Sequence, residues 1–341
     1  MMNNSNVNQS MQQFYNTVYS YAAIGAIPIT AVGLIANIFL LILFITDKYF
    51  RKATYDLLLI SICSDIIANI TSLITFIQIA IHHHDYHSGS LMCRYYVYIY
   101  ASSYGISIST LTLLAIDRYY AIIRPLSPFY RIYRRQFLIT CEIGIWILSL
   151  LIHIPTFFYM SVHRQDTLLC DFPDITNSVS AYLISFVLID NILPSSIISI
   201  AYGRIIIHQK NYVQPGQMGR NQLQNDINKR QLTKMLGTIS FFYVITTIPT
   251  SFVFLGSAIT QKSLLKIRQD SLVAFLLIFF SISVTASIST INPFLYLTFD
   301  KKLSKKALTK LGAIRNFIYE KTISTRAVFN NSGQTPTAAS T

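Results

Sequence analysis

Seven long apolar stretches alternate with polar segments along the chain. About 20 apolar residues in a helix cross the ~30 Å hydrocarbon core of a bilayer, because the α-helix rises ~1.5 Å per residue. The pattern therefore predicts an all-α membrane protein, a seven-transmembrane helix bundle, without an internal repeat. The predicted spans are residues 21–45, 55–81, 91–122, 137–159, 179–207, 232–257 and 271–297.

The third span fixes which parts of the chain lie on opposite sides of the membrane. No charged residue lies between Arg94 and Asp117, and Arg118 comes 25 positions after Cys93. At ~1.5 Å per residue this separation is roughly 38 Å, which exceeds the hydrocarbon core. Small residues crowd the middle of this span, so other helices can approach it closely.

Polar segments precede and interrupt the spans. Residues 1–20 are rich in Asn, Gln and Ser and are predicted to be a mobile extracellular tail, with Asn3 and Asn8 in glycosylation sequons. Residues 21–297 form the predicted transmembrane domain, within which 208–231 is predicted to be a cytoplasmic loop.

The polar segment after the seventh span is predicted to have two parts. Residues 300–314 place apolar side chains at helical spacing among lysines, at Leu303, Ala307, Leu308 and Leu311. This spacing favours an amphipathic helix on the inner membrane surface, where anionic lipid attracts lysine, over a solvated basic tail. Residues 315–341 are predicted to be a disordered cytoplasmic tail.

Composition and charge agree with a membrane location. Of the 341 residues 52% are hydrophobic and only 12% charged, against about 25% charged in soluble domains. Lys and Arg give a net charge of +13, and 22 of these 27 residues lie on one side of the predicted bundle. The positive-inside rule puts the N-terminus outside and the C-terminus in the cytoplasm. No cleavable signal peptide is expected, and basic groups that flank apolar spans do not indicate nucleic-acid binding.

Each span carries a motif, and the motifs follow one another at regular spacing. They are Asn37, Asp65, Asp117-Arg118-Tyr119, Trp146, Pro194 with Tyr202, Pro249, and Asn292-Pro293-Phe294-Leu295-Tyr296. This set resembles the rhodopsin-like (class A) G-protein-coupled receptors, from about Ala31 to Leu311. The resemblance implies a plasma-membrane receptor, not an enzyme, that converts binding of an extracellular ligand into activation of a heterotrimeric G protein.

The resemblance also implies a disulfide and a cytoplasmic switch. Cys93 and Cys170 match the bridged positions, and both lie on the oxidising side of the predicted topology. In the family, span six swings outward and the arginine that Arg118 resembles turns toward the tyrosines that match Tyr202 and Tyr296. The switch set is Asp117, Arg118, Tyr119, Tyr202, Pro249, Asn292, Pro293 and Tyr296.

Partners on the cytoplasmic side follow from the same resemblance. Receptor kinases and arrestin are expected there, in addition to the G protein and the lipid bilayer. Phosphorylation adds charge that such partners can recognise. The candidate acceptors beside basic residues are Ser304, Thr309, Thr322, Ser324 and Thr325.

Four positions depart from the patterns of the family or of its subgroups. Thr247 stands where a tryptophan is usual, and Lys229 stands where an acid often restrains the arginine of the third span. Both changes are expected to affect activation and not the fold. Ala286 replaces the retinal-binding lysine, so no retinal cofactor is expected, and Tyr100 replaces the acid of amine receptors.

Asp65 is an acid deep in the second span, and it requires polar partners there. Asn37, Ser107, Ser289 and Asn292 are candidates. The resemblance implies a sodium ion in this cluster, but the further asparagine of the family is Ile288 here. A protonated or hydrogen-bonded core acid is the alternative.

The outer halves of the spans supply a candidate ligand pocket. Its predicted residues are Tyr100, Ser103, Tyr104, His153, Asp190, Asn191, Thr246, Thr247 and Thr250. His153 and Asp190 are expected to approach each other between spans four and five. The acid then either binds ligand or forms a structural interhelical pair, and the sequence leaves both open.

Several functions remain as alternatives. The DRYYAIIRPL stretch and the tyrosine-rich third span favour a peptide receptor, possibly for a neuropeptide, and an invertebrate chemosensory receptor for small molecules is the second choice. A seven-span transporter or channel would carry more intramembrane charge or repeated helices. An intramembrane hydrolase would need paired acids or a metal set, and the histidines at 82–84 and 87 lie in a polar loop, so no metal site is expected.

Overall fold

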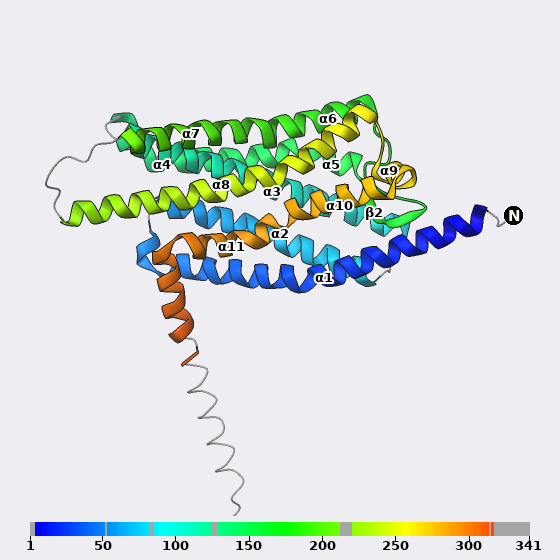
Figure 1. Ribbon diagram of the computed structural model, residues 1–341, viewed down its shortest axis with the longest axis horizontal. Coiled ribbons are helices and arrows are strands. Elements are labelled where there is room, and N and C mark those ends of the chain that lie inside the picture. The colour runs from blue at the N-terminus through cyan, green and yellow to red at the C-terminus, as the bar shows by residue number, and fades with distance from the viewer. Residues whose placement is uncertain are drawn as a thin grey trace, which may run out of the picture.

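The computed structural model describes residues 4–51, 53–81, 85–124, 128–211, 220–313 and 315–316. Six helices in these residues are long and apolar enough to cross a membrane, and a bent pair makes a seventh. The helices run side by side in an elongated bundle (Figure 1). The predicted class, an all-α seven-span membrane bundle, is confirmed.

The helices and strands follow in chain order. The first half of the bundle comprises α1 (Asn4–Thr46), η1 (Lys48–Phe50), α2 (Ala53–Ile81), α3 (Tyr86–Ile123), α4 (Pro128–Ile152) and α5 (Ile154–Tyr159). An antiparallel hairpin of β1 (Ser161–His163) and β2 (Asp166–Asp171) comes next. The second half comprises α6 (Asn177–Val187), η2 (Leu188–Ile192), α7 (Leu193–Asn211), α8 (Arg220–Thr260), α9 (Leu264–Asp270), α10 (Leu272–Ala286) and α11 (Ile288–Phe299).

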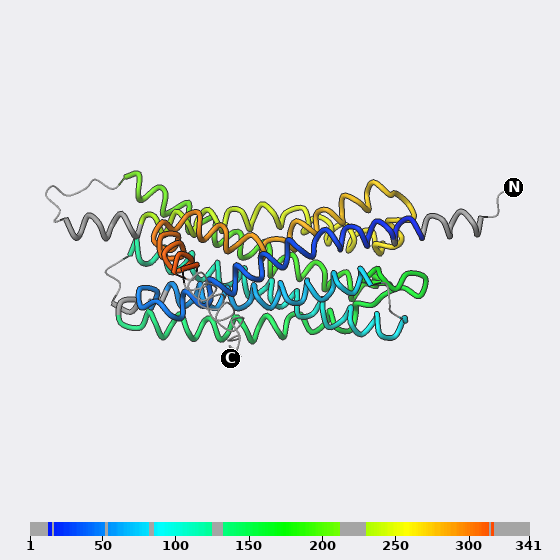
Figure 2. Tube along the Cα trace, turned by 90° about the horizontal axis from the view of Figure 1, so that it is seen from below, coloured from blue at the N-terminus to red at the C-terminus, as the bar shows by residue number. Residues whose placement is uncertain are grey.

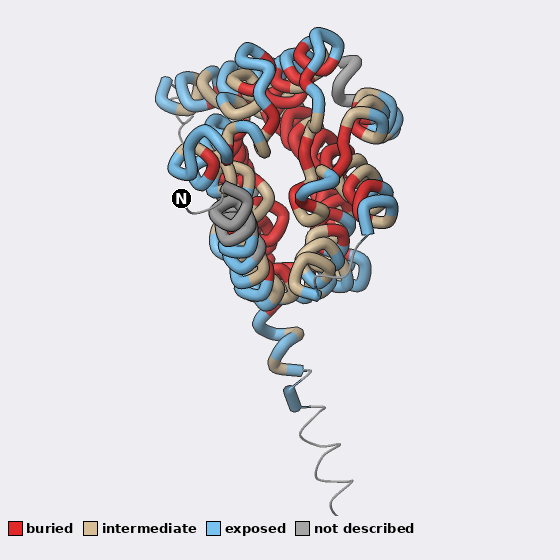
Figure 3. Tube along the Cα trace, turned by 90° about the vertical axis from the view of Figure 1, so that its right-hand side faces the viewer, coloured by how far each residue is buried: buried red, intermediate tan, exposed pale blue. Residues whose placement is uncertain are grey.

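Helix α3 is the centre of the bundle. It packs against α2, α4, α7 and α8, and most of its residues from Ala101 to Arg118 are buried. Small side chains such as Ser102, Gly105 and Ser107 allow this close packing on every side. The view along the bundle shows buried surfaces turned inward and exposed surfaces turned outward on the surrounding helices (Figure 3).

Three helices extend beyond the predicted spans. Helix α1 begins at Asn4 and α8 at Arg220, so the backbone over 4–20 is helical, and much of the predicted loop 208–231 is helical too. Hydropathy detects only the membrane-embedded part of a helix. Polar residues such as Gln, Lys and Arg have good helix propensity and continue the helix into water.

Two predicted spans are broken and a third contains a π-turn. Span four divides at His153, just before Pro155, and span seven divides at Ser287 with a bend of 46° between α10 and α11. In span five, η2 is a π-helical turn just before Pro194. Proline lacks the N–H that would bond to the preceding turn, so the helix widens there.

The hairpin closes the end of the bundle that carries the N-terminus of α3. A disulfide joins Cys93 of α3 to Cys170 of β2, with the Cα atoms 5.6 Å apart, as expected. Arg268 of α9 forms a buried ion pair with Asp166 of β2 at 2.7 Å and also lies 4.5 Å above the ring of Tyr15. These contacts tie three separate outer segments together.

At the opposite end a helix over residues 301–313 turns away from the bundle axis (Figure 2). The predicted helix is present, but its apolar side chains are divided: Leu303 and Ala307 are buried in the bundle core, while Leu308 and Leu311 are exposed. Lys306 pairs with Asp47 in the turn after α1 and lowers the pKa of that carboxyl. A position on the inner membrane surface stays a prediction.

Gly33 is the point of closest approach between α1 and α11. A Cβ atom there would lie 2.9 Å from the backbone Cα of Thr290 and 2.5 Å from its methyl group. Gly25, two turns earlier in α1, has no atom within 4 Å of an added Cβ. The two glycines therefore form a matched pair in one helix.

We expect Gly33→Ala to lower the stability of the purified protein by about 1–3 kcal/mol, because α1 and α11 must move apart. Gly25→Ala should leave stability unchanged or raise it, because alanine favours a helix by roughly 0.5–1 kcal/mol over glycine. Thermal unfolding in detergent measures both. Equal Tm values for the two variants would contradict the close contact.

Arg268→Gln should strip Asp166 of its buried partner, which typically costs about 3–5 kcal/mol. Lys262→Gln is the control, because Lys262 pairs with Asp270 at 2.5 Å on the exposed surface, where ion pairs contribute little. The Tm should fall for the first variant only. An unchanged Tm for Arg268→Gln would show that the outer segments do not depend on this pair.

Candidate ligand pocket and cytoplasmic switch

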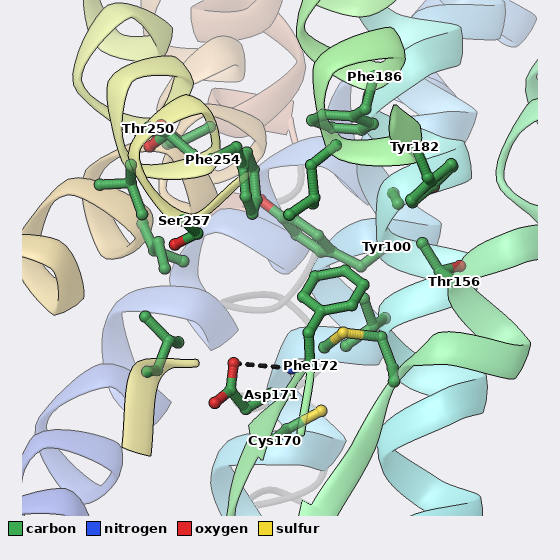
Figure 4. Close-up of a pocket in the computed structure, with 18 of the residues that line it drawn as sticks. Tyr100, Thr156, Cys170, Asp171, Phe172, Tyr182, Phe186, Thr250, Phe254 and Ser257 are labelled. Carbon is green, nitrogen blue, oxygen red and sulfur yellow. Dashed lines mark hydrogen bonds between the residues drawn. The ribbon is translucent and has the colours of Figure 1, made fainter. Parts of the chain in front are cut away.

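A cavity of about 230 Å³ lies beneath the hairpin, between α3, α6, α8 and α10. Its wall is largely aromatic and aliphatic. Tyr182 and Phe186 come from α6, Phe254 from α8, and Phe172 from the segment after β2, and all four contribute to it (Figure 4). We call this the central cavity.

The central cavity contains four of the nine predicted pocket residues. They are Tyr100, Tyr104, Asn191 and Thr250. The Tyr104 hydroxyl donates to the Asn191 side-chain oxygen, and the Tyr243 hydroxyl donates to the Tyr104 carbonyl at 3.4 Å. Thr250 shares a hydrogen bond of 2.7 Å with the hydroxyl of Thr285, which also lines the cavity.

The other five predicted residues do not line this cavity: Ser103, His153, Asp190, Thr246 and Thr247. Thr246 and Thr247 donate their hydroxyl hydrogens back to carbonyls of their own helix, at 2.8 and 3.1 Å. Sequence spacing gives the depth of a residue in the membrane. It does not fix which way the side chain points once a helix widens or bends.

Sequence reasoning missed the aromatic part of the wall. Aromatic residues on the same helices also face outward, for example Phe252, which is 70% exposed beside the cavity-lining Phe254. No pattern in the sequence separates the two orientations. Phe172 reaches the cavity only because the disulfide at Cys170 holds the hairpin over it.

Among the described residues, Asp171 is the one acidic or basic side chain that lines the central cavity, and its oxygens already accept hydrogen bonds. They accept from the backbone N–H groups of Phe172 at 2.7 Å and Leu265 at 3.2 Å. His163 Nε2 lies 3.2 Å from the same carboxylate. The central cavity therefore offers aromatic faces, hydroxyl or amide groups and one carboxylate that the protein already holds by hydrogen bonds.

His153 and Asp190 meet between α4 and η2, as expected, behind the wall of the cavity. Nε2 of His153 lies 3.4 Å from Asp190 Oδ2, and Nδ1 lies 2.6 Å from the Ser149 carbonyl oxygen. A carbonyl only accepts, so Nδ1 carries a hydrogen, and Nε2 is the ring nitrogen that faces the carboxylate. A Cβ on Gly105 would come within 2.9 Å of the His153 ring, so this glycine makes room for the pair.

The polar core surrounds Asp65. Ser107 donates to one carboxylate oxygen at 3.3 Å, and Asn292 donates to the other at 2.9 Å. Asn37 bonds to the Ser289 carbonyl instead, at 2.9 Å, and the buried hydroxyl of Ser289 has no partner among the described residues. Carboxylate and hydroxyl oxygens of this kind suit a small hard cation. A sodium ion here stays a prediction.

Two buried polar residues of the core were not anticipated. Asn69 donates to the Asp65 carbonyl at 2.8 Å and accepts from Thr290 at 2.7 Å, which links α2 to α11. Glu142 of α4 is 2% exposed and accepts from Thr110 at 2.8 Å. An acid inside an apolar stretch is a readable signal, so Glu142 could have been found from the sequence.

Arg118 lies at the cytoplasmic end of α3, according to the predicted topology, in a network around the fully buried Asp117. Arg118 Nε donates to Asp117 at 3.1 Å, and its Nη2 bonds to Thr54 of α2. Arg134 of α4 also clamps Asp117, with bonds of 2.7 and 2.8 Å, and reaches Thr54 at 3.2 Å. One carboxylate thus holds two guanidinium groups.

The remaining switch residues are distributed along the bundle, from the end that holds Arg118 to the region of the central cavity. Tyr296 of α11 is buried, and Tyr202 of α7 lies against Gly237 of α8, where an added Cβ would come within 3.3 Å of its ring. Pro249 lies within α8 and Pro293 within α11. Tyr119 packs edge-on against Tyr120 at 5.6 Å.

Several predicted residues lie outside the described residues. They are Asn3, Thr322, Ser324, Thr325 and the histidines at 82–84. The side chains of Asn8 and Lys229 are also outside the described part of the structure, although the backbone is helical at both positions. Over the described residues, no cluster of His, Cys, Asp or Glu could hold a metal ion.

Comparison with known proteins gives consistent relatives. The chain is 25% identical over 259 residues to "Rhodopsin, GQ-coupled" of Mizuhopecten yessoensis, which covers 71% of the chain and 52% of that protein. It is 25% identical over 270 residues to the human substance-P receptor, with 77% and 65% covered. It is 27% identical over 241 residues to the tachykinin-like peptides receptor 99D of Drosophila melanogaster, with 66% and 44% covered. The matches thus span about half to two thirds of these relatives.

A family profile extends the similarity over most of the described bundle. The profile of the 7 transmembrane receptor (rhodopsin family) matches residues 36–296, from the last turns of α1 to Tyr296 of α11. This range contains the disulfide, the Asp65 core, the Asp117–Arg118 pair and the central cavity. The chain therefore belongs to the rhodopsin family of seven-transmembrane receptors.

Proposed function

We propose that this protein is a plasma-membrane receptor that converts binding of an extracellular ligand into activation of a heterotrimeric G protein. The observation that carries the proposal is the restrained arginine: Arg118 is bonded to Asp117 and Thr54 at one end of α3. The central cavity lies toward the other end, beneath the hairpin. A ligand that moves α8 there would act on the arginine across the length of the bundle.

The hydrogen bonds around Asp117 explain why separating Arg118 from this carboxylate costs little free energy. A buried carboxylate that loses its cation is strongly destabilised. Asp117 keeps the two hydrogen bonds of Arg134 when Arg118 turns toward Tyr202 and Tyr296. Arg134 therefore stabilises Asp117 in the active conformation, in which α8 has moved outward. Lys229 stands where an acid could bind Arg118, so α8 supplies no carboxylate at this position to restrain the arginine.

We further propose a peptide of the neuropeptide class as the ligand. Similarity to receptors named for substance P and tachykinin-like peptides supports this class. Aromatic side chains and the Asn191 amide in the central cavity suit a short apolar peptide end. Ala286 has no amine for a Schiff base, so covalent retinal is not part of the proposal.

A chemosensory receptor for small molecules is the second candidate. The central cavity favours it, because its volume is about 230 Å³ and its one charged lining group, Asp171, is already bonded. That volume lies near the lower end of the roughly 300–1,000 Å³ of small-molecule sites. Screening peptides and uncharged small molecules in one G-protein activation assay separates the two candidates.

The proposed topology puts the N-terminus outside and the C-terminus in the cytoplasm. Supporting it, the disulfide lies at one end of the bundle and the basic segments adjoin the other. Receptor kinases and arrestin are proposed partners of the cytoplasmic face. Thr309 is exposed there on the helix over 301–313, whereas Ser304 is half-buried.

Arg118→Ala should reduce G-protein activation about tenfold or more, because hydrogen bonds to a charged group are worth roughly 1.5–3 kcal/mol. Guanine-nucleotide exchange on a panel of purified G proteins measures it, with substance P among the peptides tested. Arg135→Ala is the control, since Arg135 is an exposed guanidinium at the same end. If Arg118→Ala signals normally at equal surface expression, the proposal is wrong.

Asp190→Asn should lower the Tm, because it removes the charge that faces the buried His153 ring, and it should leave agonist potency unchanged. Asn191→Ala should lower potency, since Asn191 lines the central cavity and holds the Tyr104 hydroxyl. Dose–response curves at matched expression compare the two neighbours. A large potency loss in Asp190→Asn with an unchanged Tm would make Asp190 a ligand-binding acid.

A further inference from the structure

A second, larger cavity lies beside the central one, between α1, α2 and α10. Its volume is about 670 Å³, within the roughly 300–1,000 Å³ of small-molecule sites. Gly25 and Ala26 line it from α1, Phe76 from α2, and Ile278 and Ile282 from α10. We call this the side cavity.

Two contacts define the ends of the side cavity along α1. Tyr19 packs against Phe279 at the outer end, with ring centroids 5.4 Å apart. Gly33 closes the inner end, where α1 meets Thr290 of α11. Between them α1 presents the small residues of the AAIGA sequence at 22–26. No bulky side chain of this stretch fills the space between α1 and α10.

The exposed part of the lining lies within the predicted first span, residues 21–45. Gly25 is exposed, and Ile29, which also lines the cavity, is 63% exposed on the outside of the bundle. Both belong to the apolar helix that is long enough to span the bilayer, Gln13–Thr46. In the predicted topology this surface of α1 faces lipid chains.

The lining gives water little to bind. Among the described residues it includes no Asp, Glu, Lys, Arg or His. Four of its hydroxyl groups already donate elsewhere in the protein: Thr30 to Ala26, Ser283 to Phe279, Ser287 to Val284 and Thr290 to Asn69. A buried water needs two to four polar partners, so an apolar occupant is favoured here.

We propose that the side cavity binds one acyl chain of a membrane phospholipid, which enters from the bilayer between α1 and α10. The size, the uncharged lining and the opening within the predicted first span all match a hydrocarbon chain. The bound chain lies next to the ligand site, because Cys170, Leu264 and Ile282 line both cavities. This lipid site is additional to the proposed ligand-binding function and does not depend on it.

A tryptophan reporter tests the proposal directly. Phe76→Trp places an indole in the wall of the side cavity, and contact with brominated acyl chains quenches indole fluorescence. The protein is reconstituted in nanodiscs of phosphatidylcholine with brominated or unbrominated chains. The unmodified protein gives the background quenching that comes from its single tryptophan, Trp146. Ile79→Trp, also in the wall, serves if Phe76→Trp does not fold.

A matched glycine pair then distinguishes entry into the cavity from lipid contact outside it. Gly25→Leu fills the opening, and Gly144→Leu is the control, because neither glycine has an atom within 4 Å of an added Cβ and Gly144 does not line the side cavity. We expect the reporter to be quenched by brominated lipid, and at least half of this quenching to disappear with Gly25→Leu but not with Gly144→Leu. No quenching above that of Trp146, or equal quenching in both leucine variants, would overturn the proposal.

Discussion

A carboxylate buried inside a membrane must find its partners within the protein, and this requirement organises the core of the receptor. Four acids, Asp65, Asp117, Glu142 and Asp190, are nearly or fully buried in the apolar helices. Each has a different set of partners, and each set crosses from one helix to another. Because water is absent at this depth, a lost partner cannot be replaced by solvent. These polar contacts therefore determine which helices lie next to each other. Apolar packing alone would not select these neighbours.

The central position of α3 follows from the same requirement. Ser107, Thr110 and Asp117 lie on α3 and face α2 and α4 in three of the four networks, while Gly105 leaves space for the fourth. Small and hydroxyl-bearing side chains let one helix make polar contacts on several sides without separating the bundle. The central cavity and Arg118 are thus joined by one largely buried helix.

The helices depart from regular α-helical geometry where polar groups must point into the bundle. The π-turn of η2 turns Asp190 and Asn191 into the bundle, and the break at His153 supplies their neighbour. Just after the bend at Ser287, the Ser289 carbonyl accepts from Asn37 and Asn69 of other helices. Such breaks are tolerated in a membrane only where side chains or neighbouring helices satisfy the freed backbone groups. The two cavities differ in polarity, because Asp171 and Asn191 line the central one, whereas the described lining of the side cavity includes no charged or amide side chain.

The sequence by itself determined the number of spans, the family resemblance, the disulfide partners and the approach of His153 to Asp190. Those features depend on apolar length and on spacing along single helices, which hydropathy and motifs encode directly. Tertiary structure alone decided which predicted pocket residues face the cavity, that Arg134 shares Asp117 with Arg118, and that a space remains between α1 and α10. Helix rotation, π-turns and bends set these contacts. They arise from packing between helices distant in sequence, which no local pattern records.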